Sequence, residues 1–592
     1  MIRLAILAVV VALISLGGFG APASPQEAKR NPSLPDKKPN GDATLTLIQI
    51  GDLHGHLIPR PNLRSDGNGG EEGGLARMYT KVREIRKTDK DALLFNVGDT
   101  IQGGAEALYT RGQAMVDVLD TFGIDGYASG NWDFLYGTER YLELFGDGRW
   151  GAVAANLYYD GPPYEAKTGE RVLPPYRIKE VNGIKVGILG FATEQGEERG
   201  PTVVGGKMTQ GFRFTGDAHE MPEFIDVLRK EEKVDVIVML SEFGLARNIA
   251  LAERYPGVDV LLSQDMHEET PEAVITSTGT LISEAGQDGT QLAEVKLQVS
   301  NGRVTGREYD FHTISEDIRP DPSVAAHIAK IRREFVDSRV FRPHLNPING
   351  TTLDTPIDRV VGKTEVPLYR GNFSDHEMPG VVEGTAHDFL TDVFRDQTGA
   401  DIGVSRGFRY GTQVAPGSIL LEDLYHFIPI SPFIAKGNVT GQQLKVMIEN
   451  SINGTLSPDV LSWGRGWLPA FSGLKFDLDA YTSHGSRARN IMVQNQETGA
   501  WEPLDLSATY SIAGYWSENN PNEVAGMKTV GTSPPLTAES GEPLDATEVV
   551  VNYLKSNTAN PETGRIQLLE PLPAPVYGNP EIQPLKGVPT TR

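Results

Sequence analysis

Five short apolar runs of the sequence are each followed by polar residues that could bind a metal ion. The runs cover residues 45–50, 92–97, 234–240 and 258–262, and a fifth ends near Tyr127. In open α/β sheets, ligand sites form beyond the carboxyl ends of the strands, so we expect these side chains to converge. Oxygen and imidazole ligands without sulfur suit Mn, Fe, Zn or Mg. The candidate ligands are Asp52, His54, Asp99, Asn131, Glu242, Asp265 and His267.

Each of these residues is a weak signal by itself. A lone Gly-Asp pair, such as Gly98-Asp99, is most often a turn. His54 alone would more often be a solvated loop residue, and Trp132 and Phe134 are more typical of packing than of substrate contact. The prediction of a metal site therefore depends on the order and spacing of the whole set. Within that set, Asp99 is the carboxylate expected to bridge two ions.

The elements that must position these residues follow from the apolar pattern. The runs are apolar on both faces, as strands covered by helices on both sides are. Residues 75–86 and 221–232 have the three-to-four-residue spacing of helices. We therefore predict one α/β domain over residues 43–315. The rest is predicted as a linker helix (Pro322–Val336) with its connector (together 316–355), a second domain (356–555) and a Pro-rich tail (556–592).

The composition limits the partners and the location. The chain has 592 residues, 55 basic against 78 acidic ones, a net charge of −23 and no cysteine. Such a charge repels nucleic acid polymers, and the lack of cysteine excludes disulfides and thiolate metal sites. An apolar run from Leu4 to Leu16 and the sequence Ala21-Pro22-Ala23 predict a signal peptide (1–23) before a flexible lead-in (24–42). We expect a periplasmic or secreted protein with no membrane contact after cleavage; an uncleaved anchor is the alternative.

The order Asp52-x-His54, Gly98-Asp99, Gly130-Asn131 and two later strand ends resembles the calcineurin-like metallophosphoesterases. Asn156 and residues 183–190 also match the 5′-nucleotidase subfamily, and segments such as 384–398 and 471–474 are similar to its C-terminal domain. The resemblance implies an α/β fold. Its N-terminal domain would be a four-layer α/β/β/α metallophosphoesterase domain, followed by an α+β substrate-binding domain.

Three positions depart from the pattern of this family. Trp132, Glu242 and Asp265 stand where the family has histidines. If the ligand positions of the family are carried over to this sequence, the first metal ion would be held by Asp52, His54, Asp99 and His267. The second would be held by Asp99, Asn131, Glu242 and Asp265. Four carboxylates would then neutralise two dications, and hard oxygen ligands favour Mn over Zn. The expected cofactor is one or two divalent ions, most simply Mn. Without an imidazole at 132, a proton donor worth roughly 10²–10⁴ in rate is missing.

The resemblance also implies a reaction and a substrate site. The expected activity is hydrolysis of phosphomonoesters, such as nucleoside monophosphates, by a metal-activated hydroxide, with Asn131, Asp99 and Arg409 as catalytic residues. Arg406 and Arg409 are candidate clamps for a small anionic substrate, because guanidinium groups bind phosphate or sulfonate in pairs of hydrogen bonds. The other candidate substrate-binding residues are Phe408, Phe471 and Trp516.

Two other functions stay open. Residues 407–411 and 510–518, together with Trp132, are similar to the bacterial thiosulfohydrolase branch of the superfamily. That resemblance implies release of sulfate from a carrier protein, although the long insertion of that branch is absent between Ile58 and Gly73. The other alternative is a catalytically impaired protein that binds nucleotides or sulfonates, because three usual histidines are replaced.

Overall fold

The computed structural model describes residues 42–63, 69–193, 208–216, 219–369, 381–405, 413–456 and 467–572. The predicted signal peptide (1–23) and nearly all of the lead-in (24–42) lie outside these residues, as does the tail from residue 573. These assignments, and the predicted domain boundaries, therefore stay predictions. The description below concerns the compact unit that begins at Lys38.

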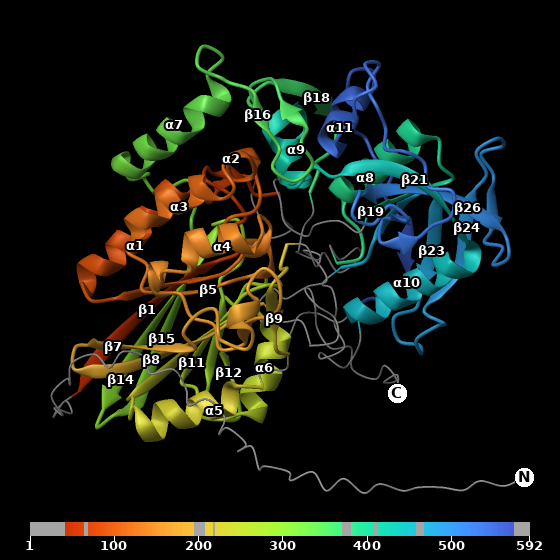
Figure 1. Ribbon diagram of the computed structural model, residues 1–592. Coiled ribbons are helices and arrows are strands. Elements are labelled where there is room, and N and C mark those ends of the chain that lie inside the picture. Colours follow the sequence, from red (N-terminus) through yellow and green to blue (C-terminus); the bar gives the residue numbers. More distant parts are fainter. Residues whose placement is uncertain are drawn as a thin grey trace, which may run out of the picture. The chain divides into compact units, whose positions relative to one another are not determined.

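Two sheets form the middle of the first domain (Figure 1). One has the order β15-β14-β1-β4-β5, and the other has the order β12-β13-β11-β10-β8-β7. The strands of the first sheet are β1 (Ala43–Gly51), β4 (Leu93–Val97), β5 (Gly126–Ala128), β14 (Gln291–Ser300) and β15 (Arg303–Thr313). Those of the second are β7 (Tyr176–Val181), β8 (Ile184–Phe191), β10 (Val236–Ser241), β11 (Val260–Ser263), β12 (Val274–Ile275) and β13 (Leu281–Glu284).

Apolar side chains between the sheets, among them Leu47, Phe95 and Val238, form the central core. A second core lies under helices on the first sheet, and a third under helices on the second sheet. The four-layer prediction is thereby confirmed, since each sheet buries one face against the other sheet and one against helices. The first helical layer includes α1 (Leu75–Thr88), α2 (Ala105–Tyr109), α3 (Gln113–Leu119), α4 (Thr138–Phe145) and α7 (Pro322–Val336), and the second includes α5 (Met221–Asp226) and α6 (Leu245–Arg254).

Helix α7 has the bounds that the sequence predicts. Asp321 caps it, because its carboxylate accepts hydrogen bonds from the backbone of Ser323 and Val324, and Pro322 occupies the first turn where no amide proton is needed. The predicted helix over 221–232 begins at Met221, but α5 ends at Asp226 and continues as a π-helical turn over Val227–Glu231.

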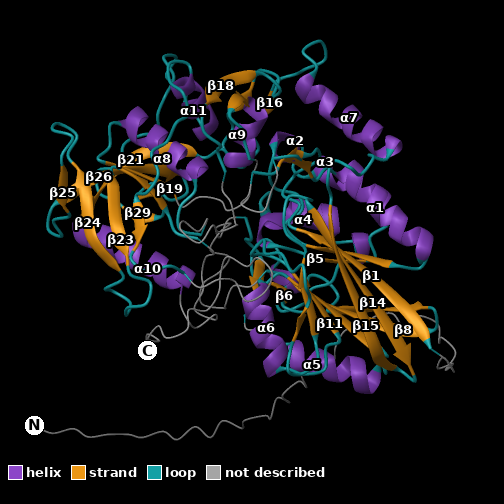
Figure 2. Cartoon of the chain, turned by 180° about the vertical axis from the view of Figure 1, so that it is seen from behind, coloured by secondary structure: helices purple, strands orange, loops and turns teal. Residues whose placement is uncertain are grey.

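The second domain is α+β, as predicted (Figure 2). Its sheets have the orders β21-β26-β19-β22 and β25-β24-β23-β29, each with parallel and antiparallel pairs. The strands of these sheets are β19 (Ile402–Ser405), β21 (Phe433–Thr440), β22 (Ala470–Ser472), β23 (Leu474–Leu478), β24 (Ala488–Gln494), β25 (Trp501–Pro503), β26 (Thr509–Trp516) and β29 (Ile566–Leu568). Two further pairs are β18 (Val360–Thr364) with β20 (Gly417–Leu420) and β27 (Glu523–Val524) with β28 (Met527–Lys528). The helices are α8 (Thr385–Thr398), α9 (Leu421–Phe427), α10 (Gly441–Leu456) and α11 (Ala546–Leu554).

Candidate metal centre

Parallel strand pairing brings the first ligand loops together. β1 pairs with β4 in parallel, so that Gly51 lies opposite Val97, and β4 pairs with β5 in the same sense. The loops that follow are joined by backbone hydrogen bonds, from Asp52 N–H to the Gly98 carbonyl (3.1 Å) and from His54 N–H to the Asp99 carbonyl (2.9 Å). The carboxyl ends of these strands therefore present Asp52, His54 and Asp99 at one edge of the sheet.

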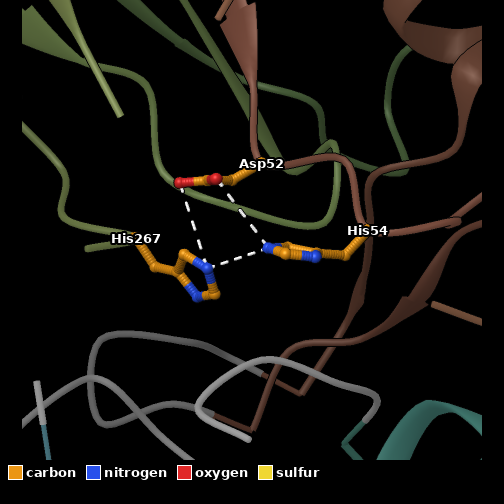
Figure 3. A group of neighbouring side chains, drawn as sticks. All are labelled: Asp52, His54 and His267. Atoms are coloured by element: carbon orange, nitrogen blue, oxygen red, sulfur yellow. Dashed lines mark hydrogen bonds and ion pairs between the residues drawn. The ribbon is translucent and has the colours of Figure 1, made fainter. Parts of the chain in front are cut away.

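Asp52, His54 and His267 form a compact buried group, although more than 200 residues separate the histidines (Figure 3). The Nε2 atoms of the two histidines are 2.9 Å apart. His54 Nε2 lies 3.8 Å from Asp52 Oδ1, and His267 Nε2 lies 4.0 Å from Asp52 Oδ2. One imidazole nitrogen from each histidine and the carboxylate of Asp52 thus face a common point, as ligands of one metal ion do.

A second buried group consists of Asp52, Asp99 and Glu242, with ligand atoms within 4.8 Å of one another. Asp99 also reaches the first group, because its Oδ2 lies 3.8 Å from His54 Nε2. Asp52 belongs to both groups, whereas the sequence suggested Asp99 as the residue between two ions. Both carboxylates therefore lie where they could connect adjacent cations.

The oxygens of these two groups fit a divalent cation. Within the described part of the chain, Asp52 Oδ1, Asn131 Oδ1 and both carboxylate oxygens of Glu242 are buried and accept no hydrogen bond. Burial, and then repulsion by Asp99, raises the pKa of Asp52 and the pKa of Glu242 well above their usual ranges. Buried oxygens without donors are costly unless a cation compensates them, so the donor set suits a hard divalent ion.

Asn131 and Asp265 lie beside these groups. Asn131 begins a short 3₁₀ turn (Asn131–Phe134), and the next backbone N–H, of Trp132, donates to Asp99 Oδ1 at 2.8 Å. The N–H of Asp265 donates to Asp52 Oδ2 at 3.2 Å, and the Asp265 side chain is partly exposed. The structure therefore brings five of the seven candidate ligands together in the two groups, and the other two, Asn131 and Asp265, lie on loops that bond these groups through backbone N–H groups.

The ligand backbone is unusual. Five of the candidate ligands have positive φ angles: Asp52 (45°), His54 (42°), Asp99 (42°), Asp265 (104°) and His267 (62°). Residues other than glycine rarely adopt this left-handed region, and such strain clusters at functional sites. Local sequence preference did not reveal it, because Asp and His are also common in ordinary loops.

Three buried polar residues that support the pocket were missed by sequence reasoning. Gln102 Oε1 lies 3.2 Å from His54 Nδ1 and accepts its proton, which leaves Nε2 directed at the pocket. Asp133 accepts hydrogen bonds from the backbone of Thr100, Ile101 and Gly130 and from the Tyr127 hydroxyl, so it fixes two ligand loops. Gln264 donates to Asp52 Oδ2 at 2.9 Å. The sequence offers one signal for two of them: Gln102 and Asp133 lie two or three residues after the predicted ligands Asp99 and Asn131.

The suggested substrate residues divide into three cases. Arg406, Phe408 and Arg409 lie outside the described residues. Phe471 is 1% exposed in the core of the second domain, where its ring packs near Phe476; the structure therefore assigns it to packing rather than to stacking on a base. Trp516 ends β26 half-buried, and its Nε1 donates to the Pro521 carbonyl at 3.1 Å.

Trp132 is buried in a small apolar cluster. Its side chain is 4% exposed, and Leu135, Ile348 and Ile430 belong to the same cluster. The residue that replaces a family histidine therefore has the surroundings of a packing residue.

Comparisons with known proteins agree with this arrangement. The calcineurin-like phosphoesterase family matches residues 45–239, and the 5′-nucleotidase C-terminal domain matches residues 360–517. A probable 5′-nucleotidase of Treponema pallidum is 22% identical over 568 residues, which cover 87% of this chain and 92% of that protein.

Two solved structures have the same fold over nearly their whole length. The 5′-nucleotidase precursor of Thermus thermophilus has a TM-score of 0.71 at 21% identity, and the match covers 89% of this chain and 99% of that one. The sulfate thiohydrolase SoxB of the same organism, in complex with glycerol, has a TM-score of 0.72 at 21% identity, with 93% and 99% covered. Among the described residues, every helix is too short or too polar to cross a membrane.

The two family matches, over residues 45–239 and 360–517, carry the assignment. The chain belongs to the 5′-nucleotidase family of calcineurin-like phosphoesterases and is a hydrolase of that type.

Proposed function

We propose that this protein is a secreted, metal-dependent hydrolase of phosphomonoesters, nucleoside monophosphates among them. The observation that carries the proposal is the buried cluster of side chains at the strand ends, where Asp52, Asn131 and Glu242 present oxygens without hydrogen-bond donors in the described chain. Two histidine nitrogens and the Asp99 carboxylate lie at the same place. The relative from Treponema pallidum, named a probable 5′-nucleotidase, supports the substrate class.

The residues divide the work around the cation. Asp52, His54, Asp99 and His267 would hold one divalent ion, and Asp99, Asn131, Glu242 and Asp265 would hold a second. When bound, such ions supply Lewis acidity toward a phosphoryl oxygen and lower the pKa of water. Because the ligands are mostly carboxylates, Mn suits the pocket better than Zn.

Other groups hold the candidate metal ligands in their orientations. Gln102 fixes the ring of His54, and the Trp132 backbone N–H holds Asp99 Oδ1. Asp133 keeps two ligand loops in place through four hydrogen bonds. In this proposal, Arg406 and Arg409 bind the small anionic substrate. The net charge of −23 disfavours nucleic acid polymers.

The test uses the purified full chain, stripped with EDTA and reloaded with Mn²⁺. We expect phosphate release from 5′-AMP and p-nitrophenyl phosphate that stops with EDTA and returns with Mn²⁺. His267→Ala should abolish it, whereas His312→Ala, which removes an imidazole paired with Glu294 at 2.9 Å, should retain it. Absence of turnover with Mn²⁺, Mg²⁺, Co²⁺ and Zn²⁺ would refute the proposal. Release of sulfate from a carrier peptide with a cysteine S-sulfonate, without phosphate release, would replace the substrate class.

Secretion is tested separately. The predicted signal peptide (1–23) implies that the exported protein begins just after Ala23. N-terminal sequencing of protein recovered from the periplasm or medium should show that start. Protein found only inside the cell with an intact N-terminus would contradict secretion.

A further inference from the structure

Gln264 is buried directly after β11, which ends at Ser263. Its backbone joins the loop of another ligand, because its N–H donates to the Ser241 carbonyl (3.1 Å) and its carbonyl accepts from Gly244 N–H (2.8 Å). Its side chain crosses to β1, where Gly51 leaves room for it. A Cβ atom on residue 51 would lie 2.5 Å from Gln264 Cγ and 2.6 Å from the Val97 carbonyl oxygen, so this packing requires glycine at position 51.

The orientation of the Gln264 amide is fixed by backbone groups. Its Oε1 accepts from Ala285 N–H at 2.7 Å, and an N–H can only donate. Its Nε2 lies 2.9 Å from the Gly286 carbonyl, which can only accept. The usual ambiguity of amide orientation is therefore resolved by the neighbours, and the second Nε2 proton must point to Asp52 Oδ2, 2.9 Å away.

This bond determines which oxygen of Asp52 faces the pocket. Oδ2 accepts from Gln264 Nε2 and from Asp265 N–H, so both of its nearby donors come from the loop after β11. Oδ1 accepts no hydrogen bond from the described chain and lies 3.8 Å from His54 Nε2. A neutral amide donor orients the carboxylate and leaves its full negative charge available to a cation.

We propose that Gln264 is a positioning residue of the metal centre, which holds Asp52 with Oδ1 toward the cation and ties Asp52 to the loop of Glu242. The inference rests on the proposed metal-dependent function. Groups that orient metal ligands contribute about 10–100-fold to metal affinity. The Gln264 amide has four hydrogen-bonding partners, which is the preorganisation that such a role requires.

The experiment measures Mn²⁺ binding to the full chain by calorimetry and the spectrum of bound Mn²⁺ by electron paramagnetic resonance. Gln264→Met keeps the side-chain length but removes the donor, and Gln264→Asn keeps an amide that is too short to reach. Asn156→Leu is the matched control: Asn156 is buried, and its amide donates to the Ala192 carbonyl (3.0 Å) and accepts from Ala192 N–H (2.9 Å) rather than bonding Asp52 or Gln264.

We expect both Gln264 variants to raise the Kd for Mn²⁺ by about 10–100-fold and to alter the spectrum, with Asn156→Leu within about threefold of the wild type. Thermal melting of the EDTA-treated proteins shows that each variant folds. If the Gln264 variants bind Mn²⁺ as the control does, the inference is overturned while the proposed function stands. If the wild type binds none of Mn²⁺, Mg²⁺, Co²⁺ and Zn²⁺, the proposed function is refuted, and this inference with it.

Discussion

Replacing Asp99 by asparagine should make the metal-free protein more stable and the metal-loaded protein less stable. Asp52, Asp99 and Glu242 have ligand atoms within 4.8 Å of one another. At that distance two full charges repel by about 3.5 kcal/mol at an effective dielectric constant of about 20. Protonation relieves part of this repulsion, so we expect Asp99→Asn to gain about 1–3 kcal/mol in EDTA. Asparagine Oδ1 can still accept from Trp132 N–H.

With Mn²⁺ the order should reverse. At a Mn²⁺ concentration of about 100 Kd, binding stabilises the wild type by about 2.7 kcal/mol, and the variant loses most of this gain.

The stability advantage of Asp99→Asn without metal should also depend on pH, with a definite sign. The folded pKa of Asp52 and of Glu242 is raised above the unfolded values of 3.8 and 4.5, so their ionised forms destabilise the metal-free protein only above those values. The advantage of the variant should therefore be small at about pH 4 and grow toward about pH 8.

Urea unfolding in EDTA and in Mn²⁺, at both pH values, measures these differences. Glu294→Gln is the control, because Glu294 is a buried carboxylate paired with His312 and Lys296 at 2.9 Å each. Its loss should cost stability in EDTA and leave the gain from Mn²⁺ intact. An Asp99→Asn variant that is less stable than the wild type in EDTA, or that retains the full gain from Mn²⁺, would refute the electrostatic reasoning.

Three further outcomes are expected. Gln102→Leu should raise the Kd for Mn²⁺ about tenfold in calorimetry, because His54 loses the acceptor that orients its ring. Trp132→Ala should lower the free energy of unfolding by about 3–5 kcal/mol in urea, since it empties a buried site. Burial, and then repulsion by Asp545, raises the pKa of Glu548 from 4.5 to about 7. Stability should therefore fall as the pH rises through this interval, and Glu548→Gln should remove about 1 kcal/mol of that loss, after allowance for solvent screening.

The strands and the ligands that follow them could be predicted because both are local signals. An apolar run such as 92–97 indicates a covered strand, and a polar residue just beyond it, such as Asp99 after Gly98, indicates an edge ligand. Helix α7 could be predicted to the residue, since its cap and its first-turn proline are adjacent in sequence.

The supporting contacts could not be predicted, because they join residues that are distant in sequence. Gln264 is 212 residues from Asp52, and no pattern in either segment indicates the bond. Phe471 is a residue to which the sequence suggested a role that the structure does not support. It is an aromatic residue in a family-like segment and was expected to contact substrate, but it lies in the core of the second domain. Burial depends on the whole domain, and the sequence near Phe471 does not determine it.

Five candidate ligands have a left-handed backbone, so the residues that would make the metal-free protein most stable differ from those that bind metal. A left-handed residue with a side chain costs about 1–2 kcal/mol, and glycine would release much of that cost. Glycine in place of Asp52 or His267, however, would provide no side-chain ligand atom. A library of this gene screened for survival at high temperature in EDTA, where bound metal adds no stability, should therefore accumulate glycine at these positions, whereas a screen for turnover should keep the strained residues.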